Sequence, residues 1–371
     1  MAKTRKPANP SNPPPNGQKH TQMTVAGAKI PSKNAVEQFY AQLDKCWKSL
    51  EQGDVEAAKQ SALKLLGSDG DSPELYALLG VIASTEGKTE EALKHYQRAS
   101  EIDDRYAEPL LFAAEIYLWD TEEFEKAVAL CTRVLDIAEE EEEFIEALLL
   151  KAEGETLLGK ENAAYASLSE LPDVGLLDHT YHLRAGRLFL DLGHPKDAEV
   201  QFHRALGIEP NDPDSLHGLG LCSEALGDRK GMIEYFQKVR LADLKLPAPP
   251  WRMSAAEFSD AVLSAIDSLP AAIQKLIANV PVISTDYPTA ETVADGVDPR
   301  SLGLFSGVPL GDKPSVGGSP HLDTILLFQC NLDQNATNRA DLEREIEITV
   351  VHEVGHFFGL TDEQLEAMGY G

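Results

Sequence analysis

The sequence lacks the features that mark membrane-spanning, exported and nucleic-acid-binding proteins. No apolar run in its 371 residues approaches the length of a membrane span, and no signal-peptide core follows the basic start. The four cysteines are scattered, without a Cys-x-x-Cys pair, so neither a disulfide framework nor a thiolate metal site is indicated. Lysine and arginine number 33 against 61 acidic residues, and the formal net charge of −28 disfavours phosphate backbones and anionic membranes as partners. We therefore expect a cytoplasmic protein that binds neither nucleic acid nor membrane.

The N-terminal segment has few large apolar residues and many prolines and asparagines. Such a composition cannot bury enough surface to form a core, so we predict a disordered, locally basic tail over residues 1–33. The rest of the chain is long enough for two or three domains, each with a core of its own.

A pattern of small and large apolar residues recurs through the middle of the chain. Three copies are Gly80, Gly87, Ala92, Tyr96 and Ala99; Gly186, Gly193, Ala198, Phe202 and Ala205; and Gly220, Gly227, Met232, Phe236 and Val239. Further copies are marked by Gly53 with Ala58 and by Gly159 with Ala164, and a degenerate unit around Glu122 and Ala127 fills the gap. Gly53 and Gly87 are 34 residues apart, as are Gly193 and Gly227, which is the period of a helix-turn-helix repeat.

The spacing has a packing explanation, because small residues let the two helices of a unit cross closely while an aromatic or other large residue fills the gap toward the next unit. This segment resembles tetratricopeptide repeats, with about six units over residues 34–245. The resemblance implies an all-α right-handed superhelix whose concave groove holds peptides or other proteins. The repeated residues themselves are expected to be core, so we select none of them as ligand-binding.

Three prolines between Leu246 and Trp251 end the repeats, because proline removes hydrogen-bond donors and disfavours helix in the preceding residue. We predict a linker over residues 246–253 and a second domain over residues 254–371. Its expected elements are a helix ending before Pro270, short strands at 280–284 and 302–305, a loop at 308–320, a strand at 322–329 and a long helix at 339–358. The apolar residues of the long helix recur every three or four positions, so one face should be buried.

The long predicted helix carries His352-Glu-Val-Gly-His356 near its end. Two imidazoles four residues apart lie on one helix face, one turn apart, so both can bind a single zinc ion. Asp362 occupies the third-ligand position of the extended pattern His-Glu-x-x-His-x-x-Gly-x-x-Asp. It follows Gly359, and glycine can adopt the positive φ that ends a helix and turns the chain back toward a metal.

Zinc held by His352, His356 and Asp362 would leave a fourth position for water, whose pKa zinc lowers to about 7. Glu353 is then the expected general base, which takes the proton from this water and gives it to the leaving amine. One other interpretation of Asp362 remains open. Thr361 and Gln364 have the spacing of a capping box, in which Asp362 would only favour a helix dipole.

Two further residues, Met368 and His321, are candidates for the site. Met368 could form an apolar floor beneath the metal, as the Met-turn does in metzincins, although we expect a buried methionine in a terminal helix. His321 is expected to be a surface residue and is left outside the site.

From about residue 254 the chain resembles the small zincin-like metallopeptidases, sometimes called minimal metzincins. The resemblance rests on Ser268-Leu-Pro270, Asn279-Val280, Gly303-Leu-Phe-Ser-Gly307, Ile325-Leu-Leu-Phe328 and His352 to Asp362. It implies a small α+β domain that binds zinc through His352, His356 and Asp362, with Glu353 as base. In other zincins the substrate adds as a strand to an edge strand beside the site helix, and residues 322–329 are the expected edge strand here.

Two functions follow from this multidomain organisation. The first is a zinc endopeptidase whose repeats recruit a protein or peptide substrate or a partner. The alternative is a repeat-based interaction scaffold whose zincin domain binds zinc structurally or hydrolyses little. Glu353 favours the enzyme, because a structural zinc site needs no base. The sequence leaves the substrate, its cleavage preference, the ligand of the repeat groove, the oligomeric state and any role of the tail open.

Overall fold

The structure, a computed structural model, describes residues 33–69, 71–172, 178–312 and 323–369. It divides into two compact units, residues 2–193 and 194–371, which are described separately. The predicted tail up to residue 32, most of the predicted loop at 308–320 and His321 lie outside the described residues. Among the helices of the described part, none combines the length and apolarity needed to cross a lipid bilayer.

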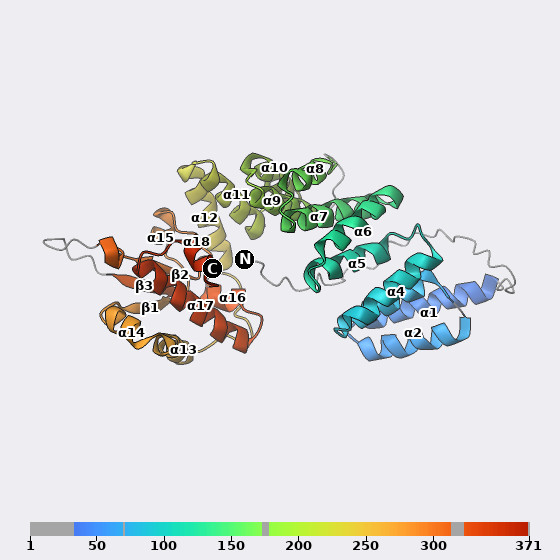
Figure 1. Cartoon of the computed structure of the whole chain (residues 1–371), viewed down its shortest axis with the longest axis horizontal. Coiled ribbons are helices and arrows are strands. Elements are labelled where there is room, and N and C mark those ends of the chain that lie inside the picture. Colours follow the sequence, from blue (N-terminus) through green and yellow to red (C-terminus); the bar gives the residue numbers. More distant parts are fainter. Residues whose placement is uncertain (1–32, 70, 173–177, 313–322, 370–371) are drawn as a thin grey trace. The chain divides into compact units, whose positions relative to one another are not determined.

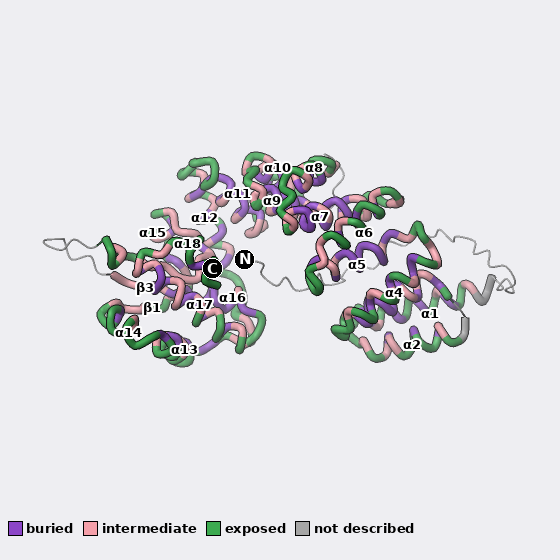
Figure 2. Tube along the Cα trace, viewed as in Figure 1, coloured by how far each residue is buried: buried purple, intermediate pink, exposed green. Residues whose placement is uncertain are grey.

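The first unit consists of helices, as predicted (Figure 1). Its elements are α1 (Lys33–Glu51), α2 (Val55–Asp69), α3 (Pro73–Thr85), α4 (Thr89–Ile102), α5 (Glu108–Trp119), α6 (Phe124–Ile137), α7 (Glu141–Leu157), α8 (Glu161–Ser169) and α9 (His179–Asp191). Neighbours in sequence pack in pairs, α1 on α2, α3 on α4, α5 on α6 and α7 on α8. Figure 2 shows buried and exposed positions alternating along these helices, as expected when one face packs on neighbouring helices.

The recurring small and large residues of the repeats are in contact. A Cβ atom added to Gly80 would lie 2.3 Å from the Tyr96 ring, so the close crossing of α3 and α4 requires glycine. The turn glycines are Gly53, Gly87, Gly159, Gly193 and Gly227, and all have φ between +69° and +80°. In the degenerate unit Glu122 adopts the left-handed conformation instead, with φ of 55°. The period of 34 therefore reflects a turn conformation that favours glycine.

The second unit begins with three repeat helices, α10 (Pro195–Ile208), α11 (Pro213–Ala225) and α12 (Arg229–Asp243). Ten further elements follow: α13 (Ala255–Ser268), α14 (Ala271–Ile277), β1 (Val282–Thr285), α15 (Ala290–Ala294), β2 (Gly303–Ser306), the short 3-10 helix η1 (Leu310–Asp312), β3 (Thr324–Phe328), α16 (Gln329–Asn335), α17 (Arg339–Phe357) and α18 (Asp362–Ala367). The predicted helix before Pro270, the three strands and the long helix are confirmed. The short helices α14, α15 and α16 were not predicted.

The three strands form one sheet in the order β1-β3-β2. β3 pairs in parallel with β1, with Ile325 opposite Val282, and antiparallel with β2, with Leu326 opposite Leu304. The expectation that residues 322–329 form the edge strand is therefore wrong. Ile325 and Leu327 are fully buried, as is typical of a central strand, whereas β1 and β2 are the edges of the sheet among the described residues.

The core of the C-terminal domain lies between the sheet, α13 and α17. Leu342, Ile346 and Val350 of α17 have no exposed surface, and α17 packs on α13, β2 and β3. The predicted buried face of the long helix is thus confirmed. Burying each of these side chains contributes on the order of 2 kcal/mol, so this face fixes how α17 lies on the sheet.

The proline-rich segment predicted as a linker is fixed to α16 by hydrogen bonds. The Trp251 indole N–H donates to the Asp333 carbonyl at 2.9 Å. The side chain of Gln329 donates to the Met253 carbonyl at 2.8 Å, and that of Gln334 donates to the Pro247 carbonyl at 3.0 Å. These contacts hold the chain in place between the repeats and α13.

Asp333 of α16 is a buried carboxylate with poor compensation. Its side chain is 1% exposed, and neither carboxylate oxygen accepts a hydrogen bond. The Arg252 guanidinium lies 3.6 Å away, and Asp286 adds a like charge nearby. Burial, opposed by Arg252 and assisted by Asp286, raises the pKa of Asp333 from 3.8 to about 6.

We predict that Asp333→Asn stabilises the second unit at neutral pH. The folded state of wild type binds the carboxyl proton more tightly than the unfolded chain does, so its stability falls as the pH rises from 3.8 through about 6. The variant should gain about 1–3 kcal/mol in free energy of unfolding at pH 7.5, and the gain should vanish near pH 4.

The free energy of unfolding is measured by urea unfolding followed by Trp251 fluorescence. Trp47 and Trp119 are replaced by phenylalanine so that the signal comes from the second unit alone. Asp260→Asn, at an exposed position of α13, serves as the control. Parallel pH profiles for wild type and Asp333→Asn would contradict the prediction.

Candidate metal centre and active site

Two histidines of α17 face each other one helical turn apart. Their Nε2 atoms are 2.9 Å apart, and the ring planes are nearly perpendicular at 78°. The Nδ1 atom of His356 lies 3.0 Å from the Leu360 carbonyl oxygen. A carbonyl oxygen only accepts hydrogen bonds, so Nδ1 carries the proton and Nε2 presents its lone pair.

Asp362 reaches the two histidines because the chain reverses after α17. Gly359 has φ of +86°, and α18 begins at Asp362. One carboxylate oxygen of Asp362, Oδ1, lies 3.3 Å from His352 Nε2 and 3.2 Å from His356 Nε2. The predicted capping box of Thr361 and Gln364 is confirmed as well. Asp362 therefore occupies the first turn of a capped helix and, at the same time, approaches both imidazoles.

The donor atoms of these three residues suit a zinc ion. Among the residues that the structure describes, they form a group whose ligand atoms all lie within 4.8 Å of one another. A tetrahedral zinc with bonds of about 2.0–2.1 Å separates its ligand atoms by about 3.3 Å, close to the observed 2.9, 3.2 and 3.3 Å. Imidazole and carboxylate donors are also the types that zinc prefers.

The approach of α18 to α17 depends on a glycine inside the histidine motif. A Cβ atom added to Gly355 would lie 2.4 Å from Leu365 Cδ2, and Leu365 is 1% exposed. The hydrogen bond from the Leu360 N–H to the Gly355 carbonyl, 3.1 Å long, fixes the same reversal. Gly355 and Leu365 together bring Asp362 to the histidines, and sequence reasoning assigned neither a role.

Met368 does not take part in this arrangement. It is 60% exposed at the end of α18, so the expectation of a buried methionine is wrong. Its side chain is not packed as an apolar floor under the histidines either. The buried apolar residue of α18 is Leu365, three positions earlier.

Glu353 is a buried residue of α17 and meets strand β2. It is 5% exposed, and the backbone N–H of Phe305 donates a hydrogen bond to its carboxylate. Burial raises the pKa of Glu353 to about 7, and the negative charge of Asp362 contributes to this rise. His352 and the hydrogen bond from the Phe305 N–H act in the opposite direction and lower the pKa. A carboxylate with this pKa is suited to exchange protons at neutral pH.

β2 lies close to Glu353 because Gly303 has no side chain. A Cβ atom there would come within 2.7 Å of Glu353 Oε1 and 2.9 Å of Thr349 Cγ2. The Leu302 carbonyl accepts from the Phe328 N–H at 2.9 Å. Since backbone groups alternate in an antiparallel pair, those of Gly303 and Phe305 are directed away from β3, toward the open edge. The edge strand beside the site helix is therefore β2.

The comparisons with known proteins find a matching family for a segment of each part of the chain. Residues 277–371 match the family model described as Zincin-like metallopeptidase, and residues 49–107 match the one described as Tetratricopeptide repeat. The chain carries a tetratricopeptide-repeat region and a C-terminal zincin-like metallopeptidase domain. The zincin-like family implies a zinc-binding site, and the cluster of His352, His356 and Asp362 fits one.

Individual relatives share less with the chain. Cellulose synthase operon protein C of Komagataeibacter sucrofermentans is 37% identical over 95 residues, which are 26% of this chain but only 7% of that protein. Among solved structures, PilW, a widely conserved type IV pilus biogenesis factor, has a TM-score of 0.50 at 16% identity over 57% of this chain and 96% of PilW. PilF of Pseudomonas aeruginosa has a TM-score of 0.49 at 18% identity, covering 58% and 96% of the two chains. The likeness to PilW concerns the fold alone.

We predict that Gly355→Ala weakens zinc binding by the zincin-like domain about tenfold, because the added methyl group pushes Leu365 and Asp362 away from the histidines. The second change Leu365→Ala should restore most of the affinity by making room for this methyl group. Competition with a chromophoric chelator measures the affinity. Gly311→Ala is the control, since a Cβ there meets no atom within 4 Å. Equal zinc affinity in Gly355→Ala and wild type would contradict this role.

Proposed function

We propose that the protein is a zinc-dependent metallopeptidase in which Glu353 is the general base and the repeats bind a protein or peptide substrate or a partner. The observation that carries the proposal is one constellation formed by α17 and the start of α18: three zinc-type donor atoms within 3.3 Å of one another and, beside them, a buried carboxylate against an open strand edge. A structural zinc site needs only the three donors.

His352, His356 and Asp362 would hold the metal. Zinc bound there would act as a Lewis acid on the scissile carbonyl and lower the pKa of a water molecule in its fourth position. Two neutral imidazoles and one carboxylate leave this site with a net positive charge, which suits a developing oxyanion. The Leu360 carbonyl fixes the tautomer of His356 and so keeps its Nε2 directed at the site.

Glu353 would move the proton during hydrolysis. Its carboxylate takes a proton from the attacking water and passes it to the nitrogen of the leaving amine as the peptide bond breaks. Burial raises the pKa of Glu353 to about 7, so near neutral pH the carboxylate can accept the proton in the first step and release it in the second. The Phe305 N–H holds the carboxylate in one orientation, which a base needs to reach both atoms.

The open edge of β2 would bind the substrate backbone. An extended peptide beside this edge would pair with the outward backbone groups of Gly303 and with the Phe305 carbonyl, as in β-strand addition. Such pairing holds a peptide by its main chain, so it demands an unfolded or extended segment and tolerates varied side chains. A scissile bond beside Gly303 would lie next to Glu353.

The tetratricopeptide-repeat region would supply the selectivity that this main-chain pairing lacks. Repeats of this type generally bind peptides or proteins, and here they precede the zincin-like domain in the same chain. Tethering a substrate through the repeats raises its effective concentration at the site. Proteins that do not bind the repeats would then be cleaved slowly.

We predict that Glu353→Gln retains zinc but hydrolyses peptide bonds at least about a hundredfold more slowly, since the amide cannot accept a proton from water. Bound zinc and cleavage of casein and of a diverse peptide library are measured for both proteins, with Glu363→Gln, an exposed neighbour of the site, as the control. Stoichiometric zinc without cleavage by wild type would instead favour a repeat-based scaffold with a structural zinc site. A wild type that binds no zinc would refute the metal centre.

Two variants distinguish a role of Asp362 as a zinc ligand from a role in stabilising the start of α18. We predict that Asp362→Asn weakens zinc binding about a hundredfold, because a charged donor is lost while the capping box of Thr361 and Gln364 remains. Thr361→Val removes the cap, which costs about 1 kcal/mol of helix stability, but keeps the donor. Chelator competition on both variants measures the difference. Equal losses of zinc affinity would show that Asp362 acts only through the helix end.

A further inference from the structure

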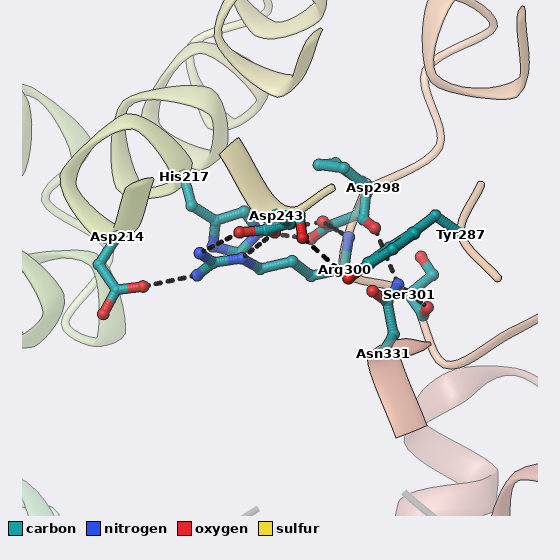
Figure 3. A network of polar contacts seen from close by, with 9 residues as sticks. Asp214, His217, Asp243, Tyr287, Asp298, Arg300, Ser301 and Asn331 are labelled. Carbon is teal, nitrogen blue, oxygen red and sulfur yellow. Dashed lines mark hydrogen bonds and ion pairs between the residues drawn. The ribbon is translucent and has the colours of Figure 1, made fainter. Parts of the chain in front are cut away.

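The last repeat helices make polar contacts with the segment that leads into β2 (Figure 3). This segment, residues 287–301, runs from the end of β1 through α15 to a turn at residues 298–301. Three side chains of α12 donate hydrogen bonds to its backbone carbonyls: Arg229 to Asp295, Gln237 to Ala290 and Arg240 to Pro288, at 2.8, 2.6 and 2.7 Å. Val293 of α15 is fully buried against Met232 and Phe236 of α12.

Arg300, within the turn, binds both repeat helices at once. Its Nε and Nη2 atoms donate to the two carboxylate oxygens of Asp243 at 2.9 and 3.2 Å, a bidentate pair at the end of α12. Its Nη1 atom donates to Asp214, in the first turn of α11, at 2.7 Å. Burial disfavours the guanidinium charge, but Asp243 and Asp214 outweigh it and raise the pKa of Arg300. Only arginine offers donors in this forked arrangement.

The turn is held from two further sides. The Asp298 carboxylate lies 2.8 Å from His217 Nε2 on α11, and it also accepts the Arg300 backbone N–H at 2.8 Å. On the other side, the Asn331 amide of α16 donates to the carbonyls on either side of Arg300, those of Pro299 and Ser301, at 2.8 and 2.7 Å. Asn331 is 7% exposed, so these two bonds are shielded from water.

This turn ends immediately before the strand that contacts the catalytic candidate. Gly303, three residues after Arg300, is the residue that packs on Glu353, and Phe305 provides the N–H to its carboxylate. With α16 fixed on the sheet side and α11 and α12 on the other, the turn has little freedom to shift along the strand direction. A shift there would move Gly303 and Phe305 together relative to Glu353.

We infer that Arg300 is a positioning residue: by bridging Asp243 and Asp214 it fixes the turn at 298–301 and thereby holds β2 against Glu353. The terminal repeat is then a structural part of the peptidase, in addition to any role in binding partners. The inference rests on the proposed function for its effect on hydrolysis, but the position of β2 can be measured without it.

The test uses the full-length chain with Arg300→Met, Arg300→Lys and the control Arg229→Met. Arg229 bonds the same segment from α12, but at Asp295, eight residues before Gly303. Hydrogen exchange of the amides at 303–306 is followed by mass spectrometry in zinc-loaded and chelated protein. Zinc affinity, kcat and KM are measured on a peptide that wild type cleaves.

In Arg300→Met we expect amide exchange at 303–306 about tenfold faster and kcat about tenfold lower, with KM and zinc affinity unchanged. Arg300→Lys keeps the charge but not the forked contact, so both values should recover in part. Arg229→Met should leave the exchange at 303–306 and kcat at wild-type levels. Should Arg300→Met fail to fold, Asp214→Asn takes its place, because it removes one partner at a half-exposed position.

Wild-type exchange at 303–306 in Arg300→Met would overturn the inference. Equally fast amide exchange at 303–306 in Arg229→Met would also overturn it, because the faster exchange would then follow from loss of any contact between α12 and the segment 287–301. If wild type cleaves no substrate, the proposed function fails while the exchange measurement still decides whether Arg300 holds β2.

Discussion

The close contact between β2 and α17 is the interaction on which the candidate active site depends. A strand can approach a helix this closely only where a side chain is missing, and Gly303 provides that position opposite Glu353. The approach lets the Phe305 N–H reach the buried carboxylate, and this hydrogen bond adds to the effect of His352 in offsetting the desolvation of Glu353. It also leaves the outer edge of β2 beside the same carboxylate. One glycine therefore determines the environment of the base and the accessibility of the strand.

The other half of the site is determined within a short stretch of chain. His352, His356, Gly359 and Asp362 could be identified from the sequence because their relation is local: helical periodicity sets the histidines one turn apart, and a glycine with positive φ reverses the chain. The repeats could also be identified from the sequence, because the same turn recurs at a fixed period. The repeat pattern singles out Gly80 and Tyr96, but it assigns the large residue to the gap toward the next unit, whereas Tyr96 also packs on Gly80 within its own unit.

What the sequence did not reveal is non-local. The edge position was assigned to the strand at 322–329, but strand order depends on pairing between segments far apart, and a strongly apolar run indicates burial without saying which neighbours provide it. Gly303 and Phe305 meet Glu353 across some fifty residues of chain, and no spacing rule connects them. Met368 was expected to be buried, yet the short α18 buries only the face that carries Leu365. Arg300 finds its two carboxylates on separate repeat helices, which its own neighbours in sequence do not indicate.

The bridge formed by Arg300 has a consequence for modularity. Repeat arrays and enzymatic domains are often treated as cassettes that can be joined or separated at a proline-rich connector. Separation at residues 246–253 would remove Asp243 and Asp214 from Arg300 and would expose Val293 to solvent. The repeat fragment would in turn keep Asp243 and Asp214 without the guanidinium that they bind. The contacts between the repeats and the C-terminal domain therefore extend well beyond the proline-rich segment at residues 246–253. A functional exchange of catalytic domains between such chains would have to carry α11 and α12 along.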